Sequence, residues 1–549
     1  MVMINTTISE LGRILKRKIS RKELEELCFR YGIDIEGEGD FVNFEVTSDR
    51  IEIISKFSLA DLLGRLMGIR VHRYDSLPSK KMDIVIKAAH RPFVNILYVK
   101  LDEPAGKELQ DLLVIQDKFD RTVGRSRSSA AIGMFDFSNI KFPIEYREVD
   151  KDSISFVPLG FDSEKSYKEI LDSTEKGKEY GSLLKEKPIV WKQKDGKIFA
   201  LPPIINADFS SLTKDTRQIF VDITGNDRYA VNALTKALAF NLQFVGEVSV
   251  VRPVYKNKNI DTGLSFKQEN FLINVSNVST LLGIELSLKE IAKTLNAMDY
   301  TVKENESGLE VSPPFYRQDV IHQVDIVDDI LRFYGAQRII PSAPSSYTPG
   351  AKLQNSGMLE NISSLLVGFG YQELDLNVLT SENYQFNKTG IKNDIYASLI
   401  GQKSGEITMA RSNLTGEMLR FISNNLHKKF PQKLFDVGFV LEKADVDVVF
   451  KNALRLSICS CGQETNLSEI VVILERLLRD SFGEKPLDIR LDETMDGFSK
   501  LFIKGRSGLL YYGGKKIGVI GEVHPRVLNE FGIELPVSLT EVYLTEFGL

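Results

Sequence analysis

Apolar residues recur at helical spacing in two distant segments of the chain, residues 11–33 and residues 282–302. Each segment contains a Leu-Gly pair, then a Ser-x-x-Glu sequence, then an amphipathic run that ends near a tyrosine. This spacing is typical of a capping box, in which a serine oxygen accepts from the third helical amide and the glutamate reaches back to the amide of the serine. The pattern predicts two capped helices, which begin after Ser20 and Ser287.

Both predicted helices are followed by a polar turn that contains glycine and then by a short apolar segment, at 41–48 and at 308–313. Such segments favour strands. We interpret the shared order as one small α/β module that occurs twice. Two unrelated capped helices are the alternative.

The chain between these segments alternates predicted strands and helices. DIVIKAAH, FVNILYVKL and SISFVPL predict strands, and IFVDITGND predicts a strand that ends in a glycine turn. YKEILDSTEKGKEYGSLLK and RYAVNALTKALAFNLQFVG each predict a helix. This order is typical of an α/β domain.

A second boundary lies at residues 340–352, which are rich in proline and serine. Beyond it, apolar residues at helical spacing in 357–369 predict a helix, and strands and helices alternate to the end of the chain. A length of 549 residues fits roughly four domains. We therefore expect a multidomain protein of mixed α/β and α+β class, divided at 1–82, 83–265, 266–345 and 346–549.

The amino-acid composition indicates which classes of protein the chain can belong to. Hydrophobic residues make up 43% and charged residues 26%, as in ordinary globular proteins. The net charge of −5 excludes a chain that is basic throughout, so any contact with RNA must come from a local patch or a partner. Three cysteines cannot build a disulfide framework, and no apolar run approaches the roughly 18 residues of a membrane span. We expect a cytoplasmic protein.

Four aspartates fall within the sequence RQDVIHQVDIVDD, residues 317–329. If residues 320–334 form a helix, Asp325, Asp328 and Asp329 share one face, and Asp319 precedes the first turn. Oxygen ligands without cysteine suit a hard cation such as Mg²⁺. The alternative is structural: acids near a helix start complement the helix dipole, and Asp328 has the spacing to pair with an arginine four residues later. His322 is expected to cap the helix or lie on the surface.

Five segments of the chain resemble a known family. SPPFYRQDVIHQVDIVDDILRFYGAQRIIP, VGRSRSSAAIGMFD, LPPIIN, RSNLTGEML and GVIGEVHPRVLNEFGIELP are similar to segments of phenylalanyl-tRNA synthetase beta subunits of the archaeal and eukaryotic type. The resemblance covers essentially the whole chain. It implies a ligase subunit in a heterotetramer of two alpha and two beta chains, which uses ATP and Mg²⁺ to join phenylalanine to tRNA(Phe). In that family the two small modules are related in fold.

The resemblance also implies a set of metal ligands. The family's beta subunit binds Mg²⁺ through four acids spaced as first, +6, +9 and +10, and these positions are Asp319, Asp325, Asp328 and Asp329 here. The family often has glutamate at the last two positions, so the shorter aspartates change the reach of the ligands.

The segment 83–265 resembles the family's editing domain, which hydrolyses tRNA charged with the wrong amino acid, chiefly tyrosine. An apolar pocket rejects an added hydroxyl only by about 10², so a second pocket that hydrogen-bonds the phenol is needed. The resemblance favours Asn206, Asp222 and Thr224 as editing residues, with Asp222 binding the amine or phenol or positioning water. No Ser-His or Cys-His pair is evident, so a positioned water is expected. The alternative is that these residues satisfy local backbone groups.

Arg121, Arg125 and Arg127 are the candidates for contact with tRNA phosphates, in the stretch DKFDRTVGRSRSS. An exposed basic loop without a ligand is the alternative.

The segment 346–549 resembles a degenerate class II synthetase core, a domain built on an antiparallel sheet, and it lacks the Arg-x-Glu and Gly-rich arginine motifs that hold ATP. We therefore expect the aminoacylation site in a partner alpha subunit. Two rivals are a scaffold without hydrolytic activity and a free-standing deacylase, which would be a monomer without an apolar interface near 357–379.

Overall fold

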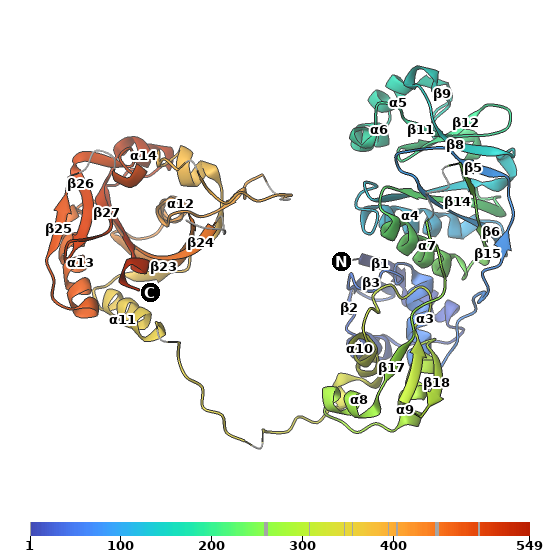
Figure 1. The fold of residues 1–549 in the computed structure, drawn as a ribbon, viewed down its shortest axis with the longest axis horizontal. Coiled ribbons are helices and arrows are strands. Elements are labelled where there is room, and N and C mark those ends of the chain that lie inside the picture. Colours follow the sequence, from blue (N-terminus) through green and yellow to red (C-terminus); the bar gives the residue numbers. More distant parts are fainter. Residues whose placement is uncertain are drawn as a thin grey trace. The chain divides into compact units, whose positions relative to one another are not determined.

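The computed structural model describes residues 2–256, 262–306, 308–344, 346–353, 355–393, 395–401, 405–444, 450–491 and 495–548. The chain divides into two compact units, Met1–Ala343 and Pro344–Leu549 (Figure 1). The expected boundary after residue 345 lies beside this division, although residue 345 itself is outside the described residues. The finer division of the first unit stays a prediction.

The two segments that the sequence pairs have the same order of elements: strand, two helices, two strands, and a third helix. Their three-stranded antiparallel sheets also share a strand order, β1-β3-β2 and β17-β19-β18. The elements of the first module are β1 (Val2–Thr7), α1 (Ile8–Ile14), α2 (Arg21–Tyr31), β2 (Asp34–Glu36), β3 (Phe41–Val46) and α3 (Lys56–Leu66). Those of the second are β17 (Phe271–Ile273), α8 (Val275–Leu282), α9 (Leu288–Ala297), β18 (Thr301–Asn305), β19 (Gly308–Ser312) and α10 (Gln323–Tyr334).

One predicted capping box forms both of its hydrogen bonds, and the other forms only one. Ser287 accepts from the amide of Glu290, and the Glu290 carboxylate accepts from the Ser287 amide at 2.8 Å. Ser20 likewise accepts from the amide of Glu23 at 3.2 Å, but the Glu23 carboxylate pairs with Arg17 instead. The helix starts were therefore predicted correctly, and a competing ion pair removes half of the first box.

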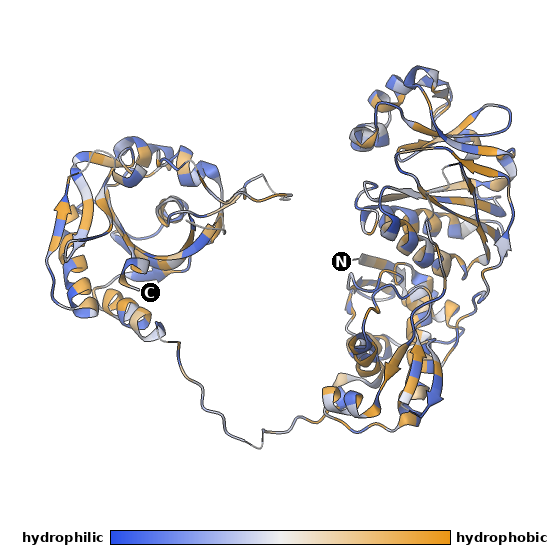
Figure 2. Ribbon diagram, viewed as in Figure 1, coloured by the Kyte–Doolittle hydropathy of each residue, from blue (hydrophilic) through white to orange (hydrophobic). Residues whose placement is uncertain are grey.

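The middle of the first unit consists of two sheets packed face to face (Figures 1 and 2). One sheet has the order β4 (Ser79–Lys80), β15 (Gly246–Val251), β6 (Phe93–Leu101), β14 (Gln218–Gly225) and β7 (Ala130–Asp136). The other has the order β13 (Ile205–Asn206), β12 (Ile198–Leu201), β11 (Ile189–Lys192), β8 (Ile144–Glu148), β5 (Ile84–Ile86) and β16 (Val254–Tyr255). Helices α4 (Leu109–Arg121) and α7 (Arg228–Leu242) cover the outer face of the first sheet.

Alternation along β14 decides which residues face inward between the two sheets. Ile219, Val221 and Ile223 pack under the two helices, whereas Phe220 packs against the second sheet. Because side chains alternate along a strand, Asp222 and Thr224 lie on the same face as Phe220. The strand therefore places a carboxylate and a hydroxyl in the space between the sheets.

The single helix predicted from YKEILDSTEKGKEYGSLLK was wrong. It is broken into α5 (Tyr167–Ser173) and α6 (Glu175–Tyr180). Thr174 between them has an extended backbone, and its hydroxyl caps α6 by accepting from the amide of Gly177 at 2.9 Å. A threonine that caps a new helix competes with continuation of the old one.

The second unit is built on one seven-stranded sheet, antiparallel except for its first pair. Helices α11 (Ser356–Gly368) and α13 (Leu467–Phe482) pack on one face, and α12 (Thr415–Asn424) and α14 (Pro525–Glu530) on the other. The strand order is β20 (Gln372–Leu374), β23 (Gln432–Lys443), β24 (Phe450–Cys461), β28 (Val537–Tyr543), β27 (Lys515–Val523), β26 (Phe502–Tyr512) and β25 (Leu487–Arg490).

All three cysteines are free and buried in apolar cores, as expected of structural residues. Across the described residues, no helix is both long and apolar enough to cross a bilayer.

Candidate functional site

A cavity of about 160 Å³ opens between the two sheets of the first unit. Its walls are mainly apolar, with contributions from β7, β12, β13 and β14. A few polar groups converge on it, among them the three residues that the sequence singles out, Asn206, Asp222 and Thr224. The remaining polar or charged lining residues are Gln116, Arg127, Lys176 and Ser211. An apolar cavity with few convergent polar groups is the usual form of a small-ligand site.

Asp222 is the most constrained of these residues. It is only 2% exposed, and its Oδ2 accepts from the indole Nε1 of Trp191 at 2.5 Å. The backbone amide of Gly133, its partner on β7, also donates to the carboxylate. Burial raises the pKa of Asp222 to about 6, against the lowering effect of these two hydrogen bonds. The group is therefore an ionisable acceptor that titrates close to neutral pH.

Glycine at position 133 is needed for the close approach of β7 to the Asp222 carboxylate. A Cβ at position 133 would lie 2.2 Å from Asp222 Oδ1 and 2.8 Å from the ring of Phe135. No side chain fits in that space, so the β7 backbone can approach the carboxylate only as glycine.

Trp191 is held from two sides by aromatic rings. Its ring lies 4.8 Å from that of Tyr146 and stacks on Phe199 at 5.9 Å. Trp191 is fully buried, so its N–H can be satisfied only inside the protein, and it points to Asp222. The indole therefore fixes the direction of the carboxylate.

Asn206 and Thr224 complete the polar lining. Asn206 Nδ2 donates to the carbonyl of Met134 at 3.2 Å, which leaves its Oδ1 as an acceptor toward the cavity. Thr224 is 1% exposed, and its carbonyl accepts from Arg91 at 2.8 Å. The structure thus brings all three predicted residues to one cavity, and their roles stay a prediction.

Arg127 supports the cavity wall. It is only 6% exposed, and its guanidinium donates to the carbonyls of Pro203 and Ile204 at 2.8 and 3.0 Å. It also pairs with Asp120 at 3.0 Å and lies over the ring of Tyr180. All of these partners are internal, so this side chain is not presented to a phosphate on the surface.

Arg121 and Arg125 are exposed, and the predicted contact with RNA stays with these two. Arg121 pairs with Asp117 at 2.9 Å, so it is partly neutralised. Arg125, Ser126 and Arg127 all have a positive φ, between 49° and 65°. Each such non-glycine residue costs roughly 1–2 kcal/mol. This left-handed turn points Arg127 inward while its neighbour Arg125 faces outward.

Sequence reasoning missed four residues that build the cavity: Gly133, Trp191, Asp120 and, in its buried role, Arg127. The signal for Trp191 was present, because it is the only tryptophan in the chain. Nothing in the sequence indicated that it faces Asp222, because the two residues lie on different sheets.

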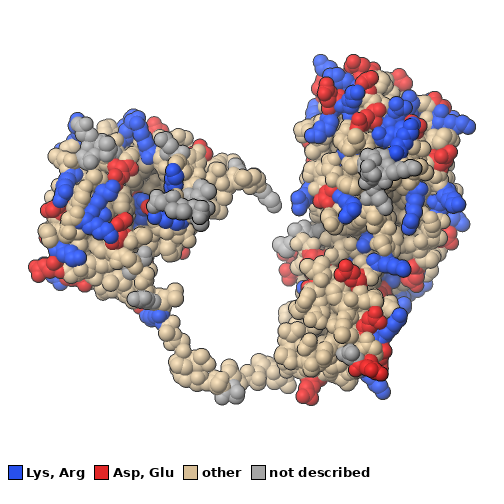
Figure 3. Space-filling view, in the orientation of Figure 1, with Lys and Arg blue, Asp and Glu red and all other residues tan. Residues whose placement is uncertain are grey.

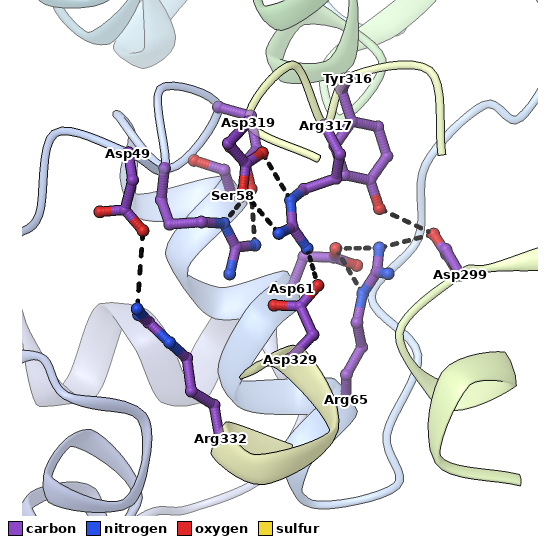
Figure 4. A network of polar contacts seen from close by, with 12 residues as sticks. Asp49, Ser58, Asp61, Arg65, Asp299, Tyr316, Arg317, Asp319, Asp329 and Arg332 are labelled. Carbon is purple, nitrogen blue, oxygen red and sulfur yellow. Dashed lines mark hydrogen bonds and ion pairs between the residues drawn. The ribbon is translucent and has the colours of Figure 1, made fainter. Parts of the chain in front are cut away.

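The four aspartates of the metal prediction lie around α10, and each is already engaged. Figure 4 shows Asp319 and Asp329 with Arg317. Arg317 binds Asp319 through two hydrogen bonds of 2.8 and 2.6 Å and reaches Asp329 at 2.5 Å. Asp325 caps the helix by accepting from the amides of Ile321 and His322. His322 is the N-cap, as expected, and the helix begins at Gln323.

Asp328 makes the predicted pair with Arg332 at 2.7 Å, and Asp329, which is 2% exposed, accepts from Tyr300 at 2.5 Å. Burial alone would raise the pKa of Asp319, but the Arg317 guanidinium outweighs burial and holds that pKa below its usual value. Helical spacing puts three of these acids near one another, but Asp329 points inward and Asp328 outward.

The contacts of the four aspartates show whether, as arranged, they could hold a Mg²⁺ ion. In the described parts of the chain, no three His, Cys, Asp or Glu side chains come together as a metal site. An ion held by all four aspartates would have to replace Arg317 between Asp319 and Asp329. The residues as arranged do not fit such an ion, and the four-ligand site stays a prediction.

Ion pairs among the acids and arginines of Figure 4 connect the two small modules. Arg65 on α3 pairs with Asp299 of the second module at 2.7 Å, and Tyr316 donates to the same carboxylate at 3.2 Å. Arg332 also approaches Asp49 of the first module at 3.7 Å. The segment that carries the aspartates therefore belongs to a junction within the first unit.

The second unit has two buried arginines, Arg411 and Arg455, that pair with buried acids. Arg411 donates to Asp436 at 3.1 Å and to the carbonyls of Leu376 and Phe439, both at 2.8 Å. Arg455 pairs with the fully buried Glu541 at 2.7 Å. An arginine that grips a triphosphate must offer its donors outward, and these two do not.

The chain matches two family models. Residues 271–336 match the tRNA synthetase B5 domain, and residues 339–544 match the CLM domain of the phenylalanyl tRNA synthetase beta chain. The chain is 32% identical to the phenylalanine–tRNA ligase beta subunit of Pyrococcus furiosus, covering 98% of both chains. It is 31% identical to that of Archaeoglobus fulgidus, covering 94% of this chain and 93% of the relative.

A solved structure is also similar. The chain resembles an N-terminal fragment of the phenylalanyl-tRNA synthetase beta subunit from Pyrococcus horikoshii, with 30% identity and a TM-score of 0.54. The match covers 60% of this chain and 99% of the fragment.

Arg317→Ala is expected to lower the free energy of unfolding by about 3–5 kcal/mol, because it leaves the buried Asp329 and the nearby Asp319 without a cation. Arg332→Ala, which breaks a more exposed pair on the same helix, should cost less than about 1 kcal/mol. Urea unfolding of the full chain measures both. Equal losses would contradict a special role for Arg317.

Asp222→Asn is expected to change the pH dependence of stability. Asp222 has a folded pKa of about 6, raised above its ordinary value near 4. Its contribution is therefore fully present below about pH 4 and is lost as the pH rises through 6. The unfolding free energy of the variant should fall less than that of the wild type between pH 4 and pH 7. Parallel curves would show that the carboxylate is not desolvated.

Proposed function

The chain belongs to the family of archaeal phenylalanine–tRNA ligase beta subunits, and from this premise we propose that it supports charging of tRNA(Phe) by a separate alpha subunit and hydrolyses Tyr-tRNA(Phe). The buried carboxylate of Asp222 at an otherwise mainly apolar cavity is the observation that carries the hydrolytic part of this proposal. The alpha subunit, in an assembly of two alpha and two beta chains in the cytoplasm, would hold the site that uses ATP and Mg²⁺.

Two features of the second unit support a division of labour between subunits. Its buried arginines are bound to internal acceptors, and its sequence lacks the motifs that hold ATP. It also keeps exposed apolar side chains at Val367, Val378 and Leu379, which are 56%, 46% and 46% exposed. Exposed apolar residues in this segment favour a subunit interface over a free-standing deacylase.

The cavity discriminates tyrosine from phenylalanine through Asp222. An ionised carboxylate only accepts hydrogen bonds, so it can receive the phenol O–H of tyrosine, and phenylalanine has no group to offer it. Asp222 keeps its bonds to Trp191 and Gly133 in either case, but a phenylalanine ring in the cavity would leave the remaining acceptor sites of this buried carboxylate unfilled, at a cost of roughly 1–3 kcal/mol or more for a charged group. This is the asymmetry that an editing site needs, because it rejects the correct amino acid.

The other groups of the cavity supply position. Apolar walls from β7, β12 and β13 hold the ring, and Trp191 with Gly133 keeps the carboxylate aimed at it. Asn206, whose Oδ1 accepts no hydrogen bond within the described residues, is placed to orient a water or the amine of the amino acid. Water then attacks the ester carbonyl carbon, the bond to the ribose oxygen breaks, and a proton passes to that oxygen. Orientation and exclusion from bulk solvent provide the rate.

The Mg²⁺ of the family enters none of these steps. The four aspartates around α10 do not converge on one point, and Arg317 neutralises two of them.

Asp222→Asn is expected to lower hydrolysis of Tyr-tRNA(Phe) by roughly 100-fold, the loss of one charge-assisted hydrogen bond. Gly133→Ala should do the same by displacing the carboxylate. Hydrolysis of preformed Tyr-tRNA(Phe) and charging with phenylalanine are measured in the complex of this chain with its cognate alpha subunit.

Asp215→Asn is the matched control, because it makes the same change on an exposed residue just before β14. It should leave both activities unchanged. Wild-type charging without any hydrolysis would overturn the editing proposal in favour of a scaffold. Loss of charging together with hydrolysis in Asp222→Asn would instead indicate damage to the fold.

A further inference from the structure

Residues 11–22 contain six cations and no carboxylate, in a chain whose net charge is −5. On the face shown in Figure 3, lysine and arginine side chains are interspersed with acidic ones. The cluster lies at the end of α1, in the turn that follows, and at the start of α2. Its members are Arg13, Lys16, Arg17, Lys18, Arg21 and Lys22.

The three arginines of this cluster are partly neutralised by glutamates that flank it: Arg13 by Glu10, Arg17 by Glu23 and Arg21 by Glu25. The three lysines, Lys16, Lys18 and Lys22, are exposed, and within the described residues they form no ion pair. Their charges are therefore available to a partner.

Two hollows meet at this cluster and share Lys16 and Arg17. One has a volume of about 730 Å³ and is lined by five of the six cations, all but Lys22. The other, of about 600 Å³, adds three cations from α3 and the segment after it, Arg65, Arg70 and Arg73.

The acids near these hollows are mostly engaged. In the larger one, Asp40 accepts from the amide and hydroxyl of Ser9, both at 2.9 Å. In the smaller one, Asp61 and Asp299 are bound by Arg65 and Arg73. Lining cations outnumber lining acids, so the surface attracts an extended anion.

The turn between α1 and α2 has an unusual backbone conformation at Lys16. Lys16 has φ 53°, in the left-handed region that favours glycine. The turn is closed by the amide of Arg17, which donates to the carbonyl of Gly12 at 3.0 Å. A lysine in a conformation that suits glycine keeps a free cation at the point where the two hollows meet.

We propose that this surface, the two hollows around Lys16 and Arg17, binds the phosphate backbone of tRNA. The choice of RNA as the occupant rests on the proposed function, which gives the chain a polyanionic substrate. No Phe, Tyr or Trp lines either hollow, and the ring of His72 in the smaller one packs edge-on against Tyr74. The surface grips phosphates and leaves the sequence unread, as contacts from lysine and arginine to phosphates do.

The test is binding of a tRNA(Phe) transcript to the full chain over a range of salt concentrations. The variant Lys16→Gln, Lys18→Gln, Lys22→Gln should weaken binding by at least about tenfold at low salt and reduce the slope of log K against log salt by roughly 3. A different tRNA should lose the same factor, because phosphate contacts carry no sequence information.

The matched control is Lys289→Gln, Lys293→Gln, Lys303→Gln. These lysines are exposed on α9 and β18 of the second small module, and their loss changes the net charge by the same amount. The control should bind within about twofold of the wild type. An equal loss in both variants, or no loss in the first, would overturn the proposal.

Charging by the complex with the alpha subunit separates this proposal from the proposed function. If the wild-type complex charges tRNA(Phe) and the first variant raises the KM for tRNA, both stand. If the wild type charges and the variant has an unchanged KM and salt slope, only the surface proposal fails. A wild-type complex that neither charges nor hydrolyses would remove the proposed function, whereas the salt dependence of binding by the chain would still decide the surface.

Discussion

A carboxylate removed from water costs several kcal/mol unless other groups replace its solvation, and the middle of the first unit is organised around one such group. Asp222 receives the indole N–H of Trp191 and the amide of Gly133, one from each of two packed sheets. The contact with Trp191 joins the two sheets at that point, and the close approach of β7 to the carboxylate requires glycine at position 133. The cavity beside it keeps mainly apolar walls, so the carboxylate is the feature that a ligand must match.

The same rule of compensation explains the junction of the two small modules. Arg317 lies between Asp319 and Asp329, and Arg65 lies against Asp299. Removing one partner from such a network costs more than the pair itself contributes, because the other charge stays buried. The aspartates at 319, 328 and 329 are paired with Arg317 and Arg332 of their own segment, and Arg332 also reaches Asp49 of the other module.

Local patterns predicted much of this architecture. The serine caps at Ser20 and Ser287, the glycine end of β14 and the helix predicted at 357–369 follow from spacing and turn chemistry, which act over a few residues. Asp222 and Thr224 share a face for the same reason. The contact with Trp191 joins residues on two sheets, and no local pattern carries that information. The sequence predicts that Arg127 belongs to a basic loop. Three consecutive residues with left-handed backbone conformation instead direct its side chain into the wall of the cavity.

The central claim is that the cavity beside Asp222 prefers tyrosine to phenylalanine. Trp191 is the only tryptophan in the chain and donates its N–H to Asp222, so its fluorescence responds to changes at that carboxylate. The most direct measurement is titration of the full chain with free L-tyrosine and with L-phenylalanine, exciting the indole beyond the absorption of tyrosine. We predict a saturable change that occurs at lower concentration with tyrosine and that is lost in Asp222→Asn. Equal responses to both amino acids, or a stronger response to phenylalanine, would contradict the account.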